Sequence, residues 1–334
     1  MNYARLFCFW LILSTGFSFA DTDGCDPTIV LPYSFQLDQD VGITDQNYTN
    51  GVSAGGELKQ PWIKDRLVEF REAWGIESSD SCPGQFQWRF GTSVFTPEDI
   101  ETRQIQRGDR PYATLAFIDF QSSVLYTARS GNERRFQSGV SLGLLGLDFG
   151  EHVQSAIHGN DRPPLGWDNQ VAEGGTPVAM LYASSSQLLR SDQLLDAFRF
   201  ELSSSYGGSF GYYTGASAQL NARLGLFADD WYVFESNYHD NFDQVGSAKR
   251  FFLWSRITGR AVAYNALLQG VPFADNTYTL SASEVNRFVL EYSIGLGGTI
   301  NEVEWVFGIK TRGEEFSGSE ARSHTWWTLG FRWG

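Results

Sequence analysis

Hydrophobic and polar side chains alternate, residue by residue, along much of this chain. The clearest stretches are residues 86–94, 136–144, 198–206, 288–296, 303–309 and 327–333. A period of two predicts β-strands with one apolar face and one polar face. About twelve such strands follow one another, an even number as bacterial outer-membrane barrels require. The pattern therefore predicts an all-β protein built from antiparallel strands.

Two segments interrupt the alternation. Residues 62–74 place Ile63, Leu67, Val68 and Phe70 among charged residues, which indicates a short amphipathic helix in a loop. Residues 149–157 have the pattern of a helical turn that leads to His158. We expect both helices to lie between strands of a single domain.

The composition separates two all-β architectures that share the same alternation. The chain has 334 residues with 26 Phe, 14 Tyr, 11 Trp and 35 Gly. The apolar faces of the expected strands are strongly aromatic, the polar faces are rich in Gly and Ser, and the last strand is aromatic as far as Trp333. These features favour a transmembrane antiparallel outer-membrane β-barrel over a soluble two-sheet sandwich. From the pattern alone the sandwich remains the alternative.

The first 20 residues are read as a secretory signal peptide. Arg5 precedes an apolar run over residues 6–13, and Ser18-Phe19-Ala20 fits a cleavage site with small residues. A membrane anchor is the alternative, but the run is short for a spanning helix. Residues 21–334 then form a single β-barrel domain, in which we expect Cys25 and Cys82 to form a disulfide.

Charge and motif content exclude several functions. Twenty-five Lys and Arg stand against 39 Asp and Glu, for a net charge of −14, so the chain lacks the basic surface that nucleic-acid binding requires. The four His residues have no zinc-finger spacing, and neither a phosphate-binding Gly-rich loop nor a G-x-S-x-G nucleophile turn occurs.

Five short stretches combine polar side chains with strand ends or turns. They are Asp38-Gln39-Asp40, Tyr48-Thr49-Asn50-Gly51, Phe95 to Asp99, Asp109 to Ala113 and, after Gln154 and His158, Gly166 to Gln170. Each has a structural explanation: a wet barrel interior for Asp38 and Asp40, turns for the Gly and Pro residues, a loop position for His158, a buried pair for Asp109 and Arg110.

Taken together and in this order, the five stretches resemble the outer-membrane lipid A 3′-O-deacylases of the LpxR type. The resemblance spans nearly the whole chain after the signal peptide. It implies a twelve-stranded barrel in the bacterial outer membrane, with an active site between the lumen wall and a short helix. The implied activity is calcium-dependent hydrolysis of an ester-linked acyl chain of lipid A, the lipid part of lipopolysaccharide, by a barrel that we expect to be a monomer.

The resemblance also assigns residues. His158 matches the family's catalytic base, Thr49 its conserved threonine, and Gln39-Asp40 its Asn-Asp pair. For the Ca²⁺ ion the implied ligands are Asp40, Asp38 and Asp161, because carboxylate oxygens suit a hard cation. A base such as His158 can take a proton from water while the cation polarises the acyl carbonyl.

Two other functions stay open at the level of sequence. A barrel with a polar interior could be a passive pore. It could also be a catalytically inactive barrel of the same family, since Gln39 replaces the family's Asn and Asp38 its Glu. The alternation itself predicts that Phe35 and Leu37 face lipid and that Asp38 and Asp40 face the lumen. Gln39 would then lie on the opposite face, unless the strand bulges or ends there.

Overall fold

The structure is a computed structural model that describes residues 33–40, 47–76, 84–128, 131–158, 164–195, 198–227, 231, 250–301 and 303–333. The expected signal peptide and the expected disulfide partners Cys25 and Cys82 lie outside these residues. The described residues form the following elements, in chain order: β1 (Tyr33–Asp40), β2 (Asn47–Glu57), α2 (Pro61–Glu72), β3 (Gln85–Thr96), β4 (Ala113–Thr127), β5 (Glu133–Leu145), α3 (Phe149–His158), the 3-10 turn η1 (Trp167–Asn169), β6 (Thr176–Leu195), β7 (Phe198–Gly211), β8 (Tyr213–Leu226), β9 (Phe251–Asn265), α4 (Ala266–Gln269), β10 (Phe288–Ile300), β11 (Val303–Arg312) and β12 (His324–Trp333).

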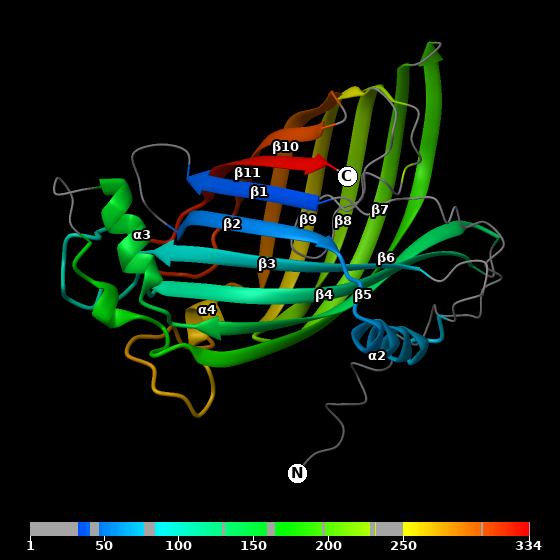
Figure 1. The fold of residues 1–334 in the computed structure, drawn as a ribbon. Helices are drawn as coiled ribbons and strands as arrows, with labels where there is room; N and C mark the ends of the chain where they lie inside the picture. The colour runs from blue at the N-terminus through cyan, green and yellow to red at the C-terminus, as the bar shows by residue number, and fades with distance from the viewer. Residues whose placement is uncertain are drawn as a thin grey trace.

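The twelve strands of the described residues close into one antiparallel barrel, in which each strand pairs with its neighbours in sequence (Figure 1). The ring is completed by β1 and β12, with Phe35 opposite Phe331. This closure confirms the predicted all-β barrel and its number of strands. It also leaves no sheet edge open to other chains.

The alternating residues of each strand point alternately outward and into the lumen, with the apolar side chains outside and the polar ones inside. On β10, Leu290, Tyr292 and Ile294 are 49%, 55% and 52% exposed on the outside, whereas Glu291 and Ser293 are 2% and 4% exposed. A two-sheet sandwich would bury the apolar face between its sheets. A single closed sheet that shows its apolar face to the outside therefore excludes that alternative. Among the described residues, no helix is both long enough and apolar enough to cross a membrane.

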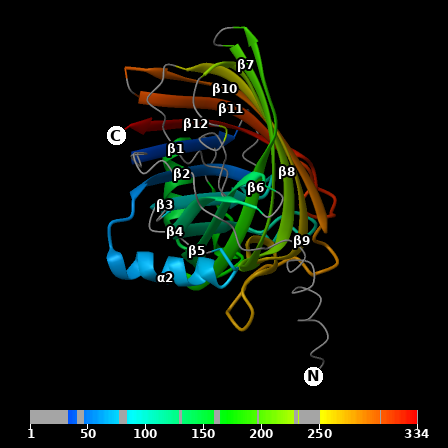
Figure 2. The same cartoon turned by 90° about the vertical axis from the view of Figure 1, so that its right-hand side faces the viewer.

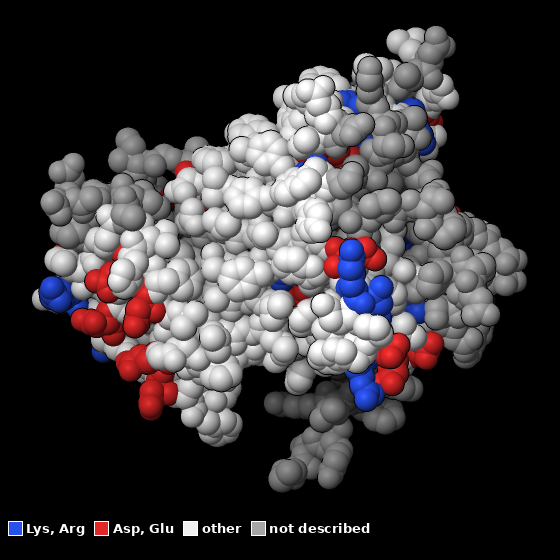
Figure 3. All heavy atoms as spheres, in the orientation of Figure 1, with Lys and Arg blue, Asp and Glu red and all other residues white. Residues whose placement is uncertain are grey.

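The face of the barrel drawn in Figure 3 carries few charges between its two ends. Charged side chains gather at one end of the barrel and around α2, and most of the wall between them is uncharged. Outer-membrane barrels have an apolar band of this kind where lipid surrounds them. The chain is thus built to sit in a membrane with both ends in water.

Among the described helices, the two that are longer than one turn lie at opposite ends of the barrel (Figure 1), and Figure 2 views the barrel from the side that carries α2. The predicted amphipathic helix is α2, which begins at Pro61 and packs Leu67 onto the outward-facing Phe86 of β3. The predicted helical turn is α3. It shares its end of the barrel with the last residue of β1, the first residues of β2, and α4.

Side chains fill much of the lumen. Ion pairs join Arg223 to Glu201 at 2.6 Å and Arg250 to Glu304 at 2.7 Å, and all four residues are buried. The aromatic ring of Trp254, only 1% exposed, packs in the same interior. Such a filled interior disfavours the passive-pore alternative, because a pore needs a continuous aqueous path.

Candidate functional site

The end of β1 distributes its polar side chains over both faces of the barrel wall. Asp38 and Asp40 are each 8% exposed and face the lumen, as the alternation predicted. Gln39 faces outward, where its side-chain oxygen accepts a hydrogen bond of 2.9 Å from the Asn50 amide of β2. The predicted Gln39-Asp40 pair therefore straddles the wall, with one residue on each side.

A β-bulge in β2 explains the Tyr-Thr-Asn-Gly stretch. The register between β2 and β3 shifts between Tyr48 and Asn50, so Thr49 is the extra residue. The shift turns Tyr48 into the lumen, where its hydroxyl donates a hydrogen bond of 3.0 Å to Asp38. Any side chain at Gly51 would collide with the Tyr48 ring, since a Cβ there would lie 1.7 Å from the Tyr48 hydroxyl. Gly51 thus makes room for Tyr48.

Register also brings Thr49 to the end of β1. The last pair that β1 and β2 form is Gln39 with Asn50, and Asp40 and Thr49 are the residues next to that pair in the two strands. The side chain of Thr49 lies outside the described part of the structure. The backbone nevertheless sets both residues at the same end of the barrel.

Helix α3 is fixed to this end of the barrel by residues of the Gly-Trp-Asp-Asn-Gln stretch. The Trp167 indole donates a hydrogen bond of 2.9 Å to the buried Gln154 side chain of α3. Trp167 also packs with Tyr112, at 4.8 Å between ring centroids, and with Phe149. Gln170, from the end of the same stretch, accepts a hydrogen bond of 3.0 Å from Thr114 of β4.

His158 is the last residue of α3, and its side chain, like Asp161, lies outside the described residues. The helix is nevertheless located by the contacts of Phe149 and Gln154. It therefore brings the backbone of His158 to the same end of the barrel as Asp40 and Thr49 (Figure 1). The predicted convergence of the three side chains remains a prediction.

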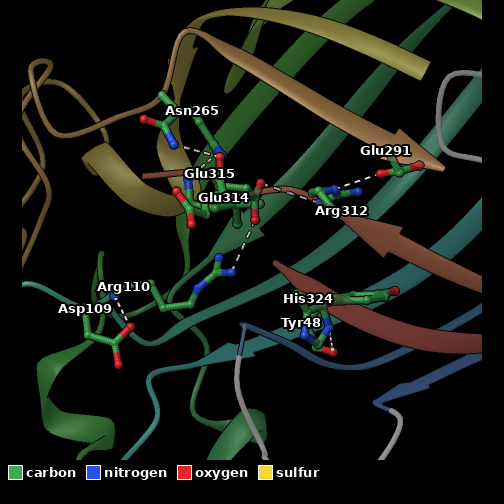
Figure 4. A network of polar contacts seen from close by, with 11 residues as sticks. Tyr48, Asp109, Arg110, Asn265, Glu291, Arg312, Glu314, Glu315 and His324 are labelled. Atoms are coloured by element: carbon green, nitrogen blue, oxygen red, sulfur yellow. Dashed lines mark hydrogen bonds and ion pairs between the residues drawn. The ribbon is translucent and has the colours of Figure 1, made fainter. Parts of the chain in front are cut away.

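The Asp-Arg-Pro-Tyr-Ala stretch braces the rim of the barrel (Figure 4). The Asp109 carboxylate accepts hydrogen bonds from the backbone amides of Glu98 and Arg110, at 2.7 and 2.6 Å. The Arg110 guanidinium stacks on the Phe95 ring and pairs with Glu315 of the loop between β11 and β12 at 3.4 Å. Both residues are buried, as expected, but the acidic group that pairs with Arg110 is Glu315.

Burial shifts the acid–base properties of this brace. It raises the pKa of the Asp109 carboxyl, against the opposing effect of the two backbone amides that bind the carboxylate. It also lowers the pKa of the Arg110 guanidinium, which Glu315 and Asp109 partly offset. These shifts result from desolvation of the charged forms. The contacts of Asp109 and Arg110 therefore give these two residues a structural role at the rim.

Sequence reasoning assigned no role to three residues that contact this region. The His324 ring stacks on Trp326 with centroids 5.4 Å apart, and its Nε2 lies 3.0 Å from the Tyr48 carbonyl oxygen. Arg312 of β11 joins Glu291 of the neighbouring strand β10 to Glu315 of the loop that follows β11 (Figure 4). Only their lumen-facing strand positions mark these residues in the sequence, because alternation does not show which side chains will contact one another.

The end of β1 carries two carboxylates, Asp38 and Asp40, that could bind a hard cation such as Ca²⁺. Asp40 supplies a buried carboxylate at the rim, and oxygen ligands of this type are those that Ca²⁺ prefers. The Asp38 carboxylate is already bound by Tyr48 and by the Gln36 amide, at 3.0 and 3.1 Å. In the part of the chain that the structure describes, no group of three His, Cys, Asp or Glu side chains converges. The contacts of Asp38 with Tyr48 and Gln36 make it a poorer ligand for a cation.

Comparison with solved structures shows the fold. LpxR from Salmonella typhimurium matches with a TM-score of 0.69 and 14% identity, over 90% of this chain and 99% of that chain. The β domain of the Bordetella autotransporter BrkA and the translocator domain of NalP from Neisseria meningitidis each match with a TM-score of 0.42 and 8% identity. The alignments cover 91% and 99% of this chain and 98% and 95% of those chains.

Comparison of sequences identifies the family. No curated protein matches the chain. The sequence model of the family described as "Outer membrane protein LpxR" matches residues 6–334. Because the match covers nearly the whole sequence, and the barrel agrees with it, the chain belongs to the LpxR family of outer-membrane proteins.

Proposed function

We propose that this barrel hydrolyses an ester-linked acyl chain of lipid A in the outer membrane. The observation that carries the proposal is the meeting of three segments at one end of an LpxR-family barrel. These are the end of β1 with Asp40, the bulge of β2 with Thr49, and α3 with His158. The family match covers all three segments.

His158 is the proposed general base. An imidazole titrates near neutral pH, so it can take a proton from the water that attacks the ester carbonyl. It can then return the proton to the departing sugar oxygen, which balances the hydrolysis. The Thr49 hydroxyl orients the water or the substrate. The outward-facing Gln39 and Asn50 amides offer hydrogen-bonding groups to the sugar or ester of a lipid that approaches along the wall.

Asp40 is the proposed carboxylate ligand of a Ca²⁺ ion, with Asp161 as the expected second ligand. When bound, a hard cation polarises an acyl carbonyl and stabilises the oxyanion that forms from it. Asp38 has a structural role on the lumen side of the wall, where it accepts hydrogen bonds from Tyr48 and Gln36.

The orientation in the membrane follows from the same proposal. Lipid A lies in the outer leaflet, so the end with α3 faces the cell exterior. That end carries the connections 97–112, 146–175 and 266–287, and the other end carries 58–84 and 227–250. The orientation therefore rests on the proposed substrate and not on loop length.

Mass spectrometry of lipid A tests the proposal. Lipid A is extracted from a host strain that carries either the chain or an empty vector, grown with and without added calcium and chelator. The proposal predicts a loss of mass equal to one acyl group only with the chain, and less of it when calcium is chelated. An unchanged lipid A, from cells with folded barrel in the outer membrane, would leave the catalytically inactive barrel as the function.

A further inference from the structure

A cavity of about 180 Å³ lies inside the lumen, close to the rim that carries the candidate site. Its lining is divided. Strands β9 and β11 contribute the cations Arg260, Lys310 and Arg312. Strands β3, β4 and β6 contribute Phe95, Leu115, Phe117 and Met180, which belong to one buried apolar cluster. In the ring of twelve strands β10 stands opposite β4, so Lys310 and the apolar cluster belong to opposite walls. Arg89 of β3 also lines the cavity on the apolar side, where it pairs with Asp119 at 3.3 Å.

Lys310 is the cation of this cavity that the protein leaves unmatched. Its side chain is 2% exposed, and within the described part of the chain no carboxylate pairs with its ammonium and no acceptor binds it. Its neighbours differ. Arg312 pairs with Glu291 at 2.8 Å and with Glu315 at 3.5 Å, and Arg260 lies 3.7 Å from Glu291. A buried cation without a counter-charge is costly, so an anion that enters the cavity would stabilise it.

The other charges of the cavity limit which anion fits. Asp38 and Glu315 also line it. Glu315 pairs with Arg110 and Arg312, whereas the Asp38 carboxylate is bound by Tyr48 and Gln36. A second negative charge near Lys310 would therefore be repelled, which disfavours a doubly charged phosphate. One negative charge on an apolar chain matches the single free ammonium and the apolar wall across the lumen.

We propose that this cavity binds the carboxylate end of a fatty acid. The carboxylate pairs with Lys310, and the first part of the hydrocarbon chain packs against Leu115, Phe117 and Met180. An engineered protein cavity of about 150 Å³ accommodates benzene, so 180 Å³ admits a short segment of chain beside the carboxylate. The binding site itself does not depend on the proposed hydrolase activity.

The position of Lys310 links the cavity to the candidate site. Asp40 pairs with Trp326 across β1 and β12, and Trp326 pairs with Lys310 across β12 and β11. All three side chains face the lumen in one row. Neighbouring strands are about 4.8 Å apart, so the Cα atoms of Asp40 and Lys310 are separated by roughly 10 Å. The fatty acid can come from the proposed hydrolysis or from free fatty acid in the membrane.

A titration of purified, folded barrel in nonionic detergent tests the binding. Octanoate labelled with ¹³C at the carboxyl is followed by NMR, and its binding is compared with that of octanol. We expect octanoate to bind at least about tenfold more tightly, because a buried ion pair adds more than 1.4 kcal/mol. Equal affinities of the acid and the alcohol would overturn the proposal, and this comparison needs no variant.

Variants locate the site. Lys310→Met should remove the preference for octanoate, and Lys310→Gln serves as a second variant if the first does not fold. The matched control is Lys64→Met, since Lys64 lies on α2 over the Phe86 ring and outside the lumen. Lys64→Met should retain the preference. An octanoate preference that survives both changes at Lys310 would contradict the assignment.

The source of the acid is read from lipids that co-purify with wild-type protein and with His158→Ala. An acid found only with wild type identifies the product of the proposed hydrolysis. The same acids with both proteins identify free membrane fatty acid. Either result supports the site. A failure of the hydrolase proposal would leave the octanoate titration unchanged, so the two proposals fail separately.

Discussion

The two longer helices sit at opposite ends of the same wall and are held there by different means. Helix α2 buries its own apolar face on the barrel, with Leu67 against Leu58 and Phe86, and its buried Arg71 adds one long hydrogen bond of 3.5 Å to Ser122. Helix α3 depends on a loop that follows it, through the hydrogen bond between Gln154 and Trp167. A helix that packs by its own pattern needs no particular partner residue. A helix held by a specific polar bond has a fixed position, as a catalytic element requires.

From this comparison we expect that removal of a carboxylate lowers the deacylation rate at the end with α3 and leaves it unchanged at the end with α2. Asp40→Ala should lower the rate of lipid A deacylation about 10²–10³-fold, the loss typical of removing one group that stabilises an oxyanion. Asp65→Ala, a carboxylate exposed on α2, is the matched control and should leave the rate unchanged. Rates are measured with purified barrels, and excess calcium should partly restore Asp40→Ala. Equal rates for wild type and Asp40→Ala would rule out the ligand role.

A substitution that weakens packing under α2 should lower the stability of the barrel and leave its activity unchanged. Leu67 is 3% exposed beneath α2, and Leu67→Ala should lower the free energy of unfolding by about 2–5 kcal/mol. The deacylation rate of the folded fraction should stay within about twofold, because the site is at the other end. Urea unfolding in detergent gives the stability, and the rate assay gives the activity. A rate that falls together with the stability would show that the two ends are coupled.

Removal of the hydrogen bond between Gln154 and Trp167 should have a smaller effect, on the position of α3 alone. Gln154→Leu leaves the buried Trp167 indole without its acceptor, which costs about 1–3 kcal/mol. We expect the rate to fall roughly tenfold as α3 loses its fixed position, with the heat-resistant barrel intact on gel electrophoresis. Gln193→Leu, on β6 at the end away from α3, is the control. A loss of rate with Gln193→Leu of equal size would remove the special role of α3.

The smallest expected effect concerns the loop between β9 and β10. Phe273 is fully exposed and has a φ of 67°, a conformation that costs a non-glycine residue roughly 1 kcal/mol. Phe273→Gly should therefore raise the free energy of unfolding by up to about 1 kcal/mol. Ala274→Gly is the control and should lower it. A destabilised Phe273→Gly variant would mean that the Phe273 ring makes contacts that stabilise the loop.

The sequence was sufficient for the fold because the relevant information is local. Alternation with period two places Leu290 outside and Glu291 inside without knowledge of their neighbours. The amphipathic pattern of α2 is local in the same sense. The pairing of β1 with β12 followed from the requirement that the barrel closes.

The candidate site was predicted only in part, because its partners are remote in sequence. Tyr48 reaches Asp38 only through the bulge at Thr49, and alternation alone would have placed Tyr48 on the lipid face. The contact of Arg110 with Glu315 spans the lumen rim between residues 205 positions apart. The family resemblance indicated segments that lie at one end of the barrel, and several of its motif residues, Trp167 and Arg110 among them, hold the scaffold.

The proposed hydrolysis depends on a base on α3, and two histidines of that helix test this dependence. The measurement is the rate of fatty-acid release from lipid A by purified wild type, His158→Ala and His152→Ala. His152 is exposed one turn into α3, 3.1 Å from the Asp148 carbonyl oxygen, and controls for a histidine in the same helix. We expect a loss of about 10²–10⁴-fold for His158→Ala and an unchanged rate for His152→Ala. Full activity of folded His158→Ala would contradict it.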